Sequence, residues 1–191
     1  MKDKKRFGII TGAGISIASG IPTFRCKNGL WAGEKAYAGE SDRSRLATKV
    51  FFAKHPMASW ERYHDFYRLM DGKKVNVGHR ALTKFLEHCS ESEGKTDALM
   101  LTQNVDGLHA ADAKASPILS KGNDPRCKPD DNTRDYWTPF VYEMHGNGFY
   151  MHCSDETKDC SRKIFRAPTL KEFDEALEQA EEKEFVNEEG N

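Results

Sequence analysis

The sequence lacks any long apolar run and has no strong excess of charge of either sign. Its 191 residues contain 29 Lys and Arg against 30 Asp and Glu. No apolar stretch approaches the ~18 residues that span a bilayer, and the apolar run after the basic start, residues 7–10, is too short for a signal peptide. We therefore expect no membrane segment, no direct nucleic-acid binding, and an intracellular location, cytoplasmic or nuclear.

Core-forming residues are also scarce. Leu, Ile, Val and Phe make up about 18% of the chain, slightly below the roughly 20% at which disorder becomes a concern. These residues cluster in short runs, however, and the net charge is only -1. The five cysteines are irregularly spaced and odd in number, so we expect no disulfide framework and a reducing compartment. The composition predicts one domain with a lean, Phe-rich core.

The small net charge conceals an uneven distribution. Residues 171–191 hold nine acids and two bases, so they carry -7 and residues 1–170 carry +6. We expect a domain over residues 1–168 and an acidic helical tail over residues 169–191. A solvated helix face is the favoured interpretation of the tail, and a partner-binding segment is the alternative.

Short apolar runs alternate with helical periodicity along the body. Strands are predicted at residues 6–11, 97–102, 139–144 and 149–153, and helices at 17–19, 56–70, after Asn76, and near 170–180. The helix capped by Asn76 is expected to bury one face, formed by Ala81, Leu82, Phe85 and Leu86. The alternation predicts an α/β fold, a Rossmann-like parallel sheet with helices on both faces. Residues 23–43 and the proline-bearing stretch 111–138 are predicted to be mobile, the latter as a polar insertion.

A glycine-rich turn follows the first predicted strand. In Gly12-Ala-Gly-Ile-Ser16 the glycines would let a pyrophosphate approach the backbone at a helix N-terminus. The dehydrogenase pattern needs a third glycine where Ile17 stands, so a dehydrogenase-type site is not supported. On this fragment alone, a tight turn that binds nothing is an equal alternative.

Read further, the run to Arg25, Gly12-Ala-Gly-Ile-Ser-Ile-Ala-Ser-Gly-Ile-Pro-Thr-Phe-Arg25, closely resembles the NAD-binding signature of the sirtuins. Two further blocks follow in the order of that family, namely residues 102–109, Thr-Gln-Asn-Val-Asp-Gly-Leu-His, and Glu143-Met-His-Gly146. Each block follows a predicted strand, at the sheet edge where ligands of open α/β folds bind. The resemblance covers residues 6–153 and implies a helical module inserted at about residues 34–95.

The resemblance implies a role for each matched side chain. His145 would be the general base that accepts a proton from a ribose hydroxyl of NAD, a task that suits the pKa of histidine. Asn104 would hold the nicotinamide ribose and Asp106 the carboxamide, and Phe24 would exclude water. The implied cofactor-binding residues are Gly12, Ala13, Gly14, Ser16, Ile21, Pro22, Phe24, Arg25, Gln103, Asn104 and Asp106, with His145 and Asn104 catalytic.

The implied activity is NAD-dependent deacylation of an acyl-lysine protein or peptide. The acyl group is transferred to ADP-ribose, and nicotinamide is released. Two alternatives remain: an ADP-ribosyltransferase or NAD hydrolase that uses the same pocket, and an inactive NAD-binding remnant. The remnant is considered because nothing after Pro168 matches the second half of the family's sheet.

Three departures from the family pattern affect these expectations. Thr23 replaces the usual aspartate. The family's zinc site needs two Cys-x-x-Cys pairs, whereas here Cys153 is followed by Glu156 and then by Cys160. Cys153 and Cys160 are therefore the candidate ligands of an incomplete zinc site, and an intact site is not expected. Members that remove acidic acyl groups carry Tyr-x-x-Arg, but after Tyr63 the arginine position holds Phe66. We therefore predict a preference for short neutral acyl groups, unless a shift in helix register brings Arg68 into that position.

Overall fold

The computed structural model describes residues 4–23, 45–92, 96–120, 138–155, 157, 163–176 and 178–179. The chain divides into two compact units. The first comprises Met1–Glu34 and Gly72–Phe165, and the second comprises Lys35–Asp71 and Arg166–Asn191.

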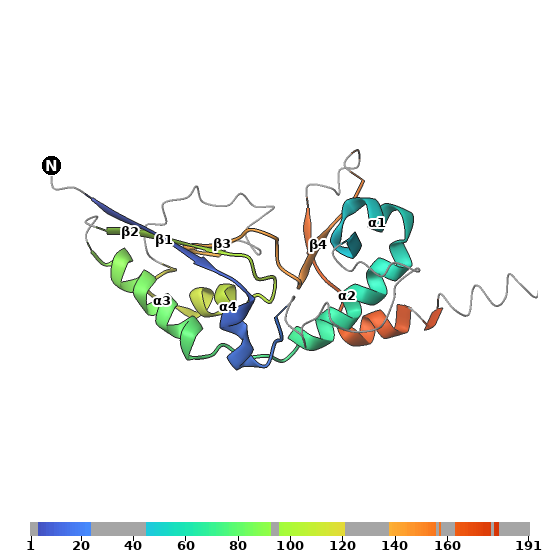
Figure 1. The fold of residues 1–191 in the computed structure, drawn as a ribbon, viewed down its shortest axis with the longest axis horizontal. Helices are drawn as coiled ribbons and strands as arrows, with labels where there is room; N and C mark the ends of the chain where they lie inside the picture. The colour runs from blue at the N-terminus through green and yellow to red at the C-terminus, as the bar shows by residue number, and fades with distance from the viewer. Residues whose placement is uncertain are drawn as a thin grey trace, which may run out of the picture. The chain divides into compact units, whose positions relative to one another are not determined.

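A parallel sheet of three strands forms the centre of the first unit (Figure 1). The strands are β1 (Lys5–Thr11), β2 (Thr96–Thr102) and β3 (Val141–Glu143), in the spatial order β1-β2-β3. Both neighbouring pairs are parallel. The predicted α/β architecture with a parallel sheet is confirmed.

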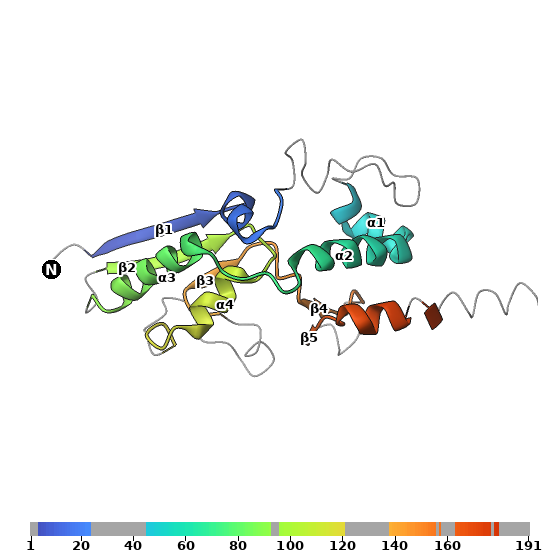
Figure 2. The ribbon, with the colours of Figure 1, turned by 90° about the horizontal axis from the view of Figure 1, so that it is seen from below.

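Two helices cover one face of this sheet. α3 (Val77–Ser90) packs against β2, and α4 (Leu108–Ala115) packs against β3 and α3. Both views place the two helices on the same side of the strands (Figures 1 and 2). The core of the unit lies in this layer and consists of Leu86, Cys89, Ala98, Met100, Ala113, Leu119, Phe140 and Val141. None of the helices in the described ranges is long and apolar enough to cross a membrane.

The opposite face of the sheet remains accessible. Ile10, Leu101 and Tyr142 are neighbours in the strand register, and Ile10 is 70% exposed and Tyr142 52% exposed. Side chains alternate between faces along a strand, so Ile9, Met100 and Val141 point toward the helices while these three point away. Within the described residues, the helices expected on both faces are seen on one.

The first helix differs from its prediction. The expected start at Ile17 was too late, because a 3-10 helix, η1, already begins at Ala13 and runs to Ser19 (Ala13–Ser19). Gly20 ends it in the left-handed region, at φ 81°, and donates its N–H to the carbonyls of Ile17 and Ser16. A left-handed C-cap of this kind is favoured by glycine.

The buried face of α3 is also displaced from the expected one. Leu86 is fully buried as predicted, but Ala81 is exposed and Phe85 is 36% exposed. His79 and Thr83 are buried in their place. The ring of Phe85 instead meets that of Phe7 edge to face, at 5.5 Å between centroids, so its apolar surface contacts the edge strand rather than the core.

The third and fourth predicted strands are shorter than expected. β3 begins at Val141 because Phe140 adopts φ 59°, which is incompatible with an extended strand. β4 (Tyr150–His152) does not join the parallel sheet but pairs with β5 (Ile164–Arg166) in a separate two-stranded sheet. Residues 111–115, expected within the polar insertion, belong to α4, consistent with their three alanines.

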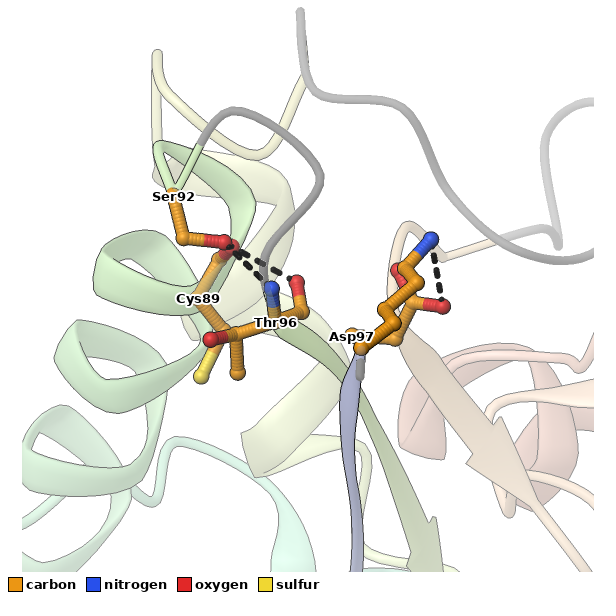
Figure 3. A network of polar contacts seen from close by, with 5 residues as sticks. Cys89, Ser92, Thr96 and Asp97 are labelled. Atoms are coloured by element: carbon orange, nitrogen blue, oxygen red, sulfur yellow. Dashed lines mark hydrogen bonds and ion pairs between the residues drawn. The ribbon is translucent and has the colours of Figure 1, made fainter. Parts of the chain in front are cut away.

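The side chain of Ser92 links the end of α3 to the start of β2 (Figure 3). The Ser92 hydroxyl donates to the Cys89 carbonyl at 2.7 Å and accepts from the Thr96 N–H at 2.8 Å. One residue further, Asp97 pairs with Lys4 at 2.8 Å. Both ion-pair partners are partly exposed, so we expect this pair to contribute little to stability.

The second unit is built around an aromatic cluster. The helix α1 (Lys49–Lys54) packs against the short 3-10 helix η2 (Arg45–Ala47) and against α2 (Pro56–Met70). A helix over residues 170–176 contributes Phe173, whose ring contacts those of Trp60, Tyr63 and His64 at centroid distances of 5.6, 6.4 and 4.7 Å. The helix predicted at residues 56–70 is confirmed, and the helix predicted near 170–180 is confirmed over residues 170–176.

Asn76 connects η1 to α3, in addition to capping α3 as predicted. Its carboxamide oxygen accepts from the Gly78 N–H at 2.8 Å, and its own N–H donates to His79 Nδ1 at 3.2 Å. Its amide nitrogen donates to the Ile15 carbonyl at 2.8 Å and to the Ser19 hydroxyl at 2.9 Å. The cap of one helix therefore also holds the glycine-rich turn.

Asn76→Ala removes both sets of bonds, and we expect it to lower the free energy of unfolding by about 2 kcal/mol. Asn76→Asp keeps the capping oxygen and loses only the donors to η1, so the loss should be about half as large. Urea denaturation followed by circular dichroism measures both variants. Equal stability of wild type and Asn76→Ala would contradict the assignment.

Candidate functional site

The three parallel strands end in one row. The register pairs Thr11 with Thr102 and Thr102 with Glu143. The segments that carry the three sequence motifs therefore leave the sheet side by side at its carboxyl edge. This edge is where ligands of open α/β sheets bind.

A buried hydrogen-bond network joins the first two segments. The Ser16 hydroxyl donates to Asp106 Oδ2 at 2.6 Å and accepts from Asn104 Nδ2 at 3.1 Å. The other carboxylate oxygen of Asp106 accepts from the Leu108 N–H at 3.0 Å. Ser16, Asn104 and Asp106 are 1%, 4% and 6% exposed. The structure thus brings together three of the residues predicted to bind cofactor.

This network fixes the orientation of the Asn104 amide. Its nitrogen is directed at Ser16, and its backbone N–H donates to Thr102 Oγ1 at 3.1 Å. Its carboxamide oxygen is buried and has no hydrogen-bond partner among the described residues. A buried acceptor without a partner costs about 1–3 kcal/mol. A ligand hydroxyl or N–H at this point would remove that cost.

The glycine-rich turn leaves space beside the network. A Cβ placed on Gly12 or on Gly14 would meet no described atom within 4 Å. Ala13 is half-buried and Gly14 is exposed. The turn can therefore accept a ligand against its backbone without displacing any side chain that the structure describes.

The remaining predicted cofactor residues have varied surroundings. Gln103 has an exposed side chain, and its N–H continues the sheet by donating to the Thr11 carbonyl at 3.0 Å. Ile21 is buried, with its N–H donating to the Ser16 carbonyl at 3.2 Å, and Pro22 is half-buried. Phe24 and Arg25 lie outside the described residues.

His145 lies in the turn that follows β3, and its side chain is exposed. The preceding residue, Met144, extends the strand by donating its N–H to the Thr102 carbonyl at 2.9 Å. The turn closes when the Gly146 N–H donates to the Glu143 carbonyl at 3.1 Å, with Gly146 at φ 80°. His145 is therefore presented at the same edge as Asn104.

Glu143 is a titratable group at the base of this turn. Burial raises its pKa to about 7, and Asp106 acts in the same direction. The hydrogen bond from Asn147 and the charge of Lys114 partly oppose this rise. This carboxyl therefore holds a proton more readily than an ordinary glutamate does.

Two buried histidines pack against each other close to Asp106. His79 of α3 and His109 of α4 are fully buried or nearly so, and their ring centroids lie 4.7 Å apart. Burial, reinforced by His79, lowers the pKa of His109 to about 4, whereas Asp106 and Asp112 oppose the shift. Both rings are thus neutral at physiological pH and belong to the packing rather than to the chemistry.

The metal prediction concerned Cys153 and Cys160. Cys153 is half-buried and not in a disulfide, and Cys160 lies outside the described residues. No group of three or more possible metal ligands occurs within the described ranges.

Sequence reasoning missed several residues that support the site. Thr102 receives the Asn104 N–H, Asn76 holds η1, and Asn147 bonds Glu143 at 2.8 Å. Thr102 is the first residue of the matched block 102–109 and Asn147 directly follows the block that ends at Gly146, and these positions were the available signal. Asn76 was expected to cap α3, but its bonds to η1 were not predicted.

Comparison with known proteins identifies the family. A model of the Sir2 family matches residues 12–119, more than half of the chain. The chain belongs to the Sir2 family. The matched residues include η1, β2, α4 and the loop between β2 and α4, which together form the Asn104 network.

Individual relatives match over most of this chain. A protein of Daphnia pulex named NAD-dependent protein deacylase is 34% identical over 73% of the chain and 49% of its own length. An Aquifex aeolicus (strain VF5) protein of the same name is 39% identical over 68% of the chain and 50% of its own length. The chain thus spans about half the length of the curated relatives it matches.

Solved structures agree with these relatives. A Sir2 homologue mutant in complex with ADP-ribose superimposes with a TM-score of 0.54 at 26% identity, covering 87% of this chain and 51% of that one. A Sir2 homologue–NAD complex gives a TM-score of 0.53 at 25% identity, covering 87% and 50%.

The lowered pKa of His109 predicts an acid-sensitive fold. Between about pH 6.5 and 4 the unfolded chain binds the proton that the folded chain rejects, so stability falls as the pH falls. A shift of this size corresponds to about 3 kcal/mol. His109→Leu should flatten this part of the curve of unfolding free energy against pH.

The matched control is His88→Leu, at an exposed position of α3. It should leave the curve close to that of wild type. Because burial also lowers the pKa of His79, part of the slope should remain in His109→Leu. An unchanged slope in His109→Leu would contradict the buried, neutral state of the pair.

Proposed function

We propose that this protein is an NAD-dependent protein lysine deacylase, with NAD and an acylated lysine side chain as substrates. One observation carries the proposal: the Ser16, Asn104 and His145 segments leave three adjacent parallel strands at one edge. The relatives named NAD-dependent protein deacylase and the family match support the same activity.

The residues present fit a dinucleotide. The amide oxygen of Asn104 is buried and has no hydrogen-bond partner in the described part of the chain. A ribose hydroxyl could donate a hydrogen bond to it. Gly12 and Gly14 leave room for the backbone to approach a phosphate. When bound, NAD supplies an ADP-ribosyl group with nicotinamide as its leaving group.

Each protein group has a limited task in this proposal. His145 accepts a proton from a ribose hydroxyl, which makes that oxygen a better nucleophile. Ser16 and Asp106 hold the Asn104 amide so that its oxygen faces the ligand. Buried hydrogen bonds of this kind fix a donor or acceptor in place before the reaction, which favours catalysis.

Incubation with NAD and an acetyl-lysine peptide, followed by mass spectrometry, tests the activity. We expect nicotinamide and O-acetyl-ADP-ribose, and a loss of at least about 100-fold in His145→Ala, in line with general-base catalysis. Nicotinamide with free ADP-ribose alone would indicate NAD hydrolysis instead. Binding of NAD without turnover would indicate a non-catalytic NAD-binding protein.

Acyl preference is set in α2 under this proposal. Phe66 stands where an arginine would pair an acidic acyl group, and Arg68, two positions further along α2, has its Nη2 3.4 Å from Asp174 Oδ1. A carboxylate-bearing acyl group would lack a dedicated partner, which costs binding energy.

We expect kcat/KM for an acetyl-lysine peptide to exceed that for the matching succinyl-lysine peptide by at least about tenfold, because a charged group is left unpaired. Phe66→Arg should raise succinyl turnover, and Arg68→Ala should leave the ratio unchanged. A wild-type preference for succinyl peptides, lost in Arg68→Ala, would contradict this account.

A further inference from the structure

A side-chain hydrogen bond joins the residues on either side of His145 in the turn after β3. Asn147 Nδ2 donates to Glu143 Oε1 at 2.8 Å. These two residues lie two positions before and two positions after His145. The bond therefore spans the histidine and restricts the backbone on both sides of it.

Beside this asparagine, the turn is bonded to the Asn104–Leu108 segment through the backbone of Gly148. The side-chain oxygen of Asn147 accepts from the Phe149 N–H at 2.9 Å, and the next residue, Gly148, donates its N–H to the Val105 carbonyl at 2.7 Å. The amide nitrogen of Asn147 lies 3.0 Å from where a Cβ on Gly107 would stand. Gly107 adopts φ 68°, so this close approach needs glycine for both conformation and space.

His145 depends on this support because its side chain is exposed. Packing does not hold an exposed ring, so the backbone of the turn sets the direction in which the imidazole points. A displacement of about 1 Å at a catalytic group can cost roughly 100-fold in rate.

We propose that Glu143 and Asn147 are positioning residues that hold His145 against the Asn104–Leu108 segment. The inference rests on the proposed function, since it assigns them a role in placing the general base. Neither residue needs to touch a substrate. They contribute through the hydrogen bond between them. A substitution at Asn147 can break this bond, and a second substitution at Glu143 can restore it with donor and acceptor exchanged.

The charge on Glu143 makes this bond testable by pH. The groups that act on it are Asn147, Lys114 of α4 and Asp106. Replacing Asn147 by aspartate sets two carboxyl groups against each other, and two nearby carboxylates repel once both are ionised. Adding Glu143→Gln restores one donor to one acceptor without that repulsion.

The experiment compares the wild-type chain with Asn147→Ala, Asn147→Asp, Glu143→Gln and the double variant Glu143→Gln/Asn147→Asp. Tyr142→Phe, on the exposed face of β3, is the matched control. Two readouts are taken: kcat and KM for deacetylation between pH 6 and 9, and the NMR signals of the His145 ring, assigned by their loss in His145→Ala.

We expect Asn147→Ala to lower kcat roughly 10- to 100-fold with KM for NAD nearly unchanged. Asn147→Asp should lose further activity as the pH rises, and the double variant should recover most of it. Glu143→Gln keeps an acceptor for Asn147 and should lose less activity than Asn147→Ala, whereas the control Tyr142→Phe should stay within about threefold of wild type. Wild-type kcat in Asn147→Ala, or no recovery in the double variant, would overturn the inference.

The NMR readout separates this inference from the proposed function. If wild type turns over no acyl peptide, the proposed function fails, and the His145 signals alone decide the positioning role. Signals that change in Asn147→Ala and return toward wild type in the double variant support the role. Signals that are the same in wild type and Asn147→Ala overturn it.

Discussion

The hydroxyl of Ser16 is the contact on which the candidate site depends. It donates to Asp106 and accepts from Asn104, so one oxygen links the turn after β1 to the loop after β2 across 90 residues of sequence. Because the hydroxyl is 1% exposed, water cannot easily replace either bond, and each is more valuable for that reason. Ser16 holds the amide nitrogen of Asn104, and the amide oxygen has no hydrogen-bond partner among the described residues.

The sheet makes this contact possible. The register places Thr11, Thr102 and Glu143 in one row, so three segments that are distant in sequence start from neighbouring points. The strands fix where each segment begins, and local hydrogen bonds then restrain its backbone. In the segment after β1 the amide of Asn76 bonds the Ile15 carbonyl, and in the segment after β3 the amide of Asn147 bonds Glu143. The candidate site is therefore held together by a few hydrogen bonds added to a parallel sheet.

The sequence was informative wherever the governing interaction is local. Apolar runs located β1 and β2, Pro56 and Asn76 marked the starts of α2 and α3, and the motif residues were expected at one sheet edge. Features set by distant partners were not predictable. Phe85 contacts Phe7, Phe140 leaves the extended conformation, and Asn147 approaches Gly107, all of which depend on residues brought together only by folding.

Titration with NAD by calorimetry tests the central claim most directly, using wild type, Ser16→Ala and Asn104→Ala, with Tyr142→Phe as the control. Ser16→Ala leaves Asn104 in place but removes the hydroxyl that orients its amide. We expect wild type to bind NAD and both site variants to bind it about tenfold or more weakly. A tenfold loss corresponds to about 1.4 kcal/mol, close to the contribution of one hydrogen bond between neutral groups. Wild-type affinity in Ser16→Ala would contradict the claim that this hydroxyl organises the site.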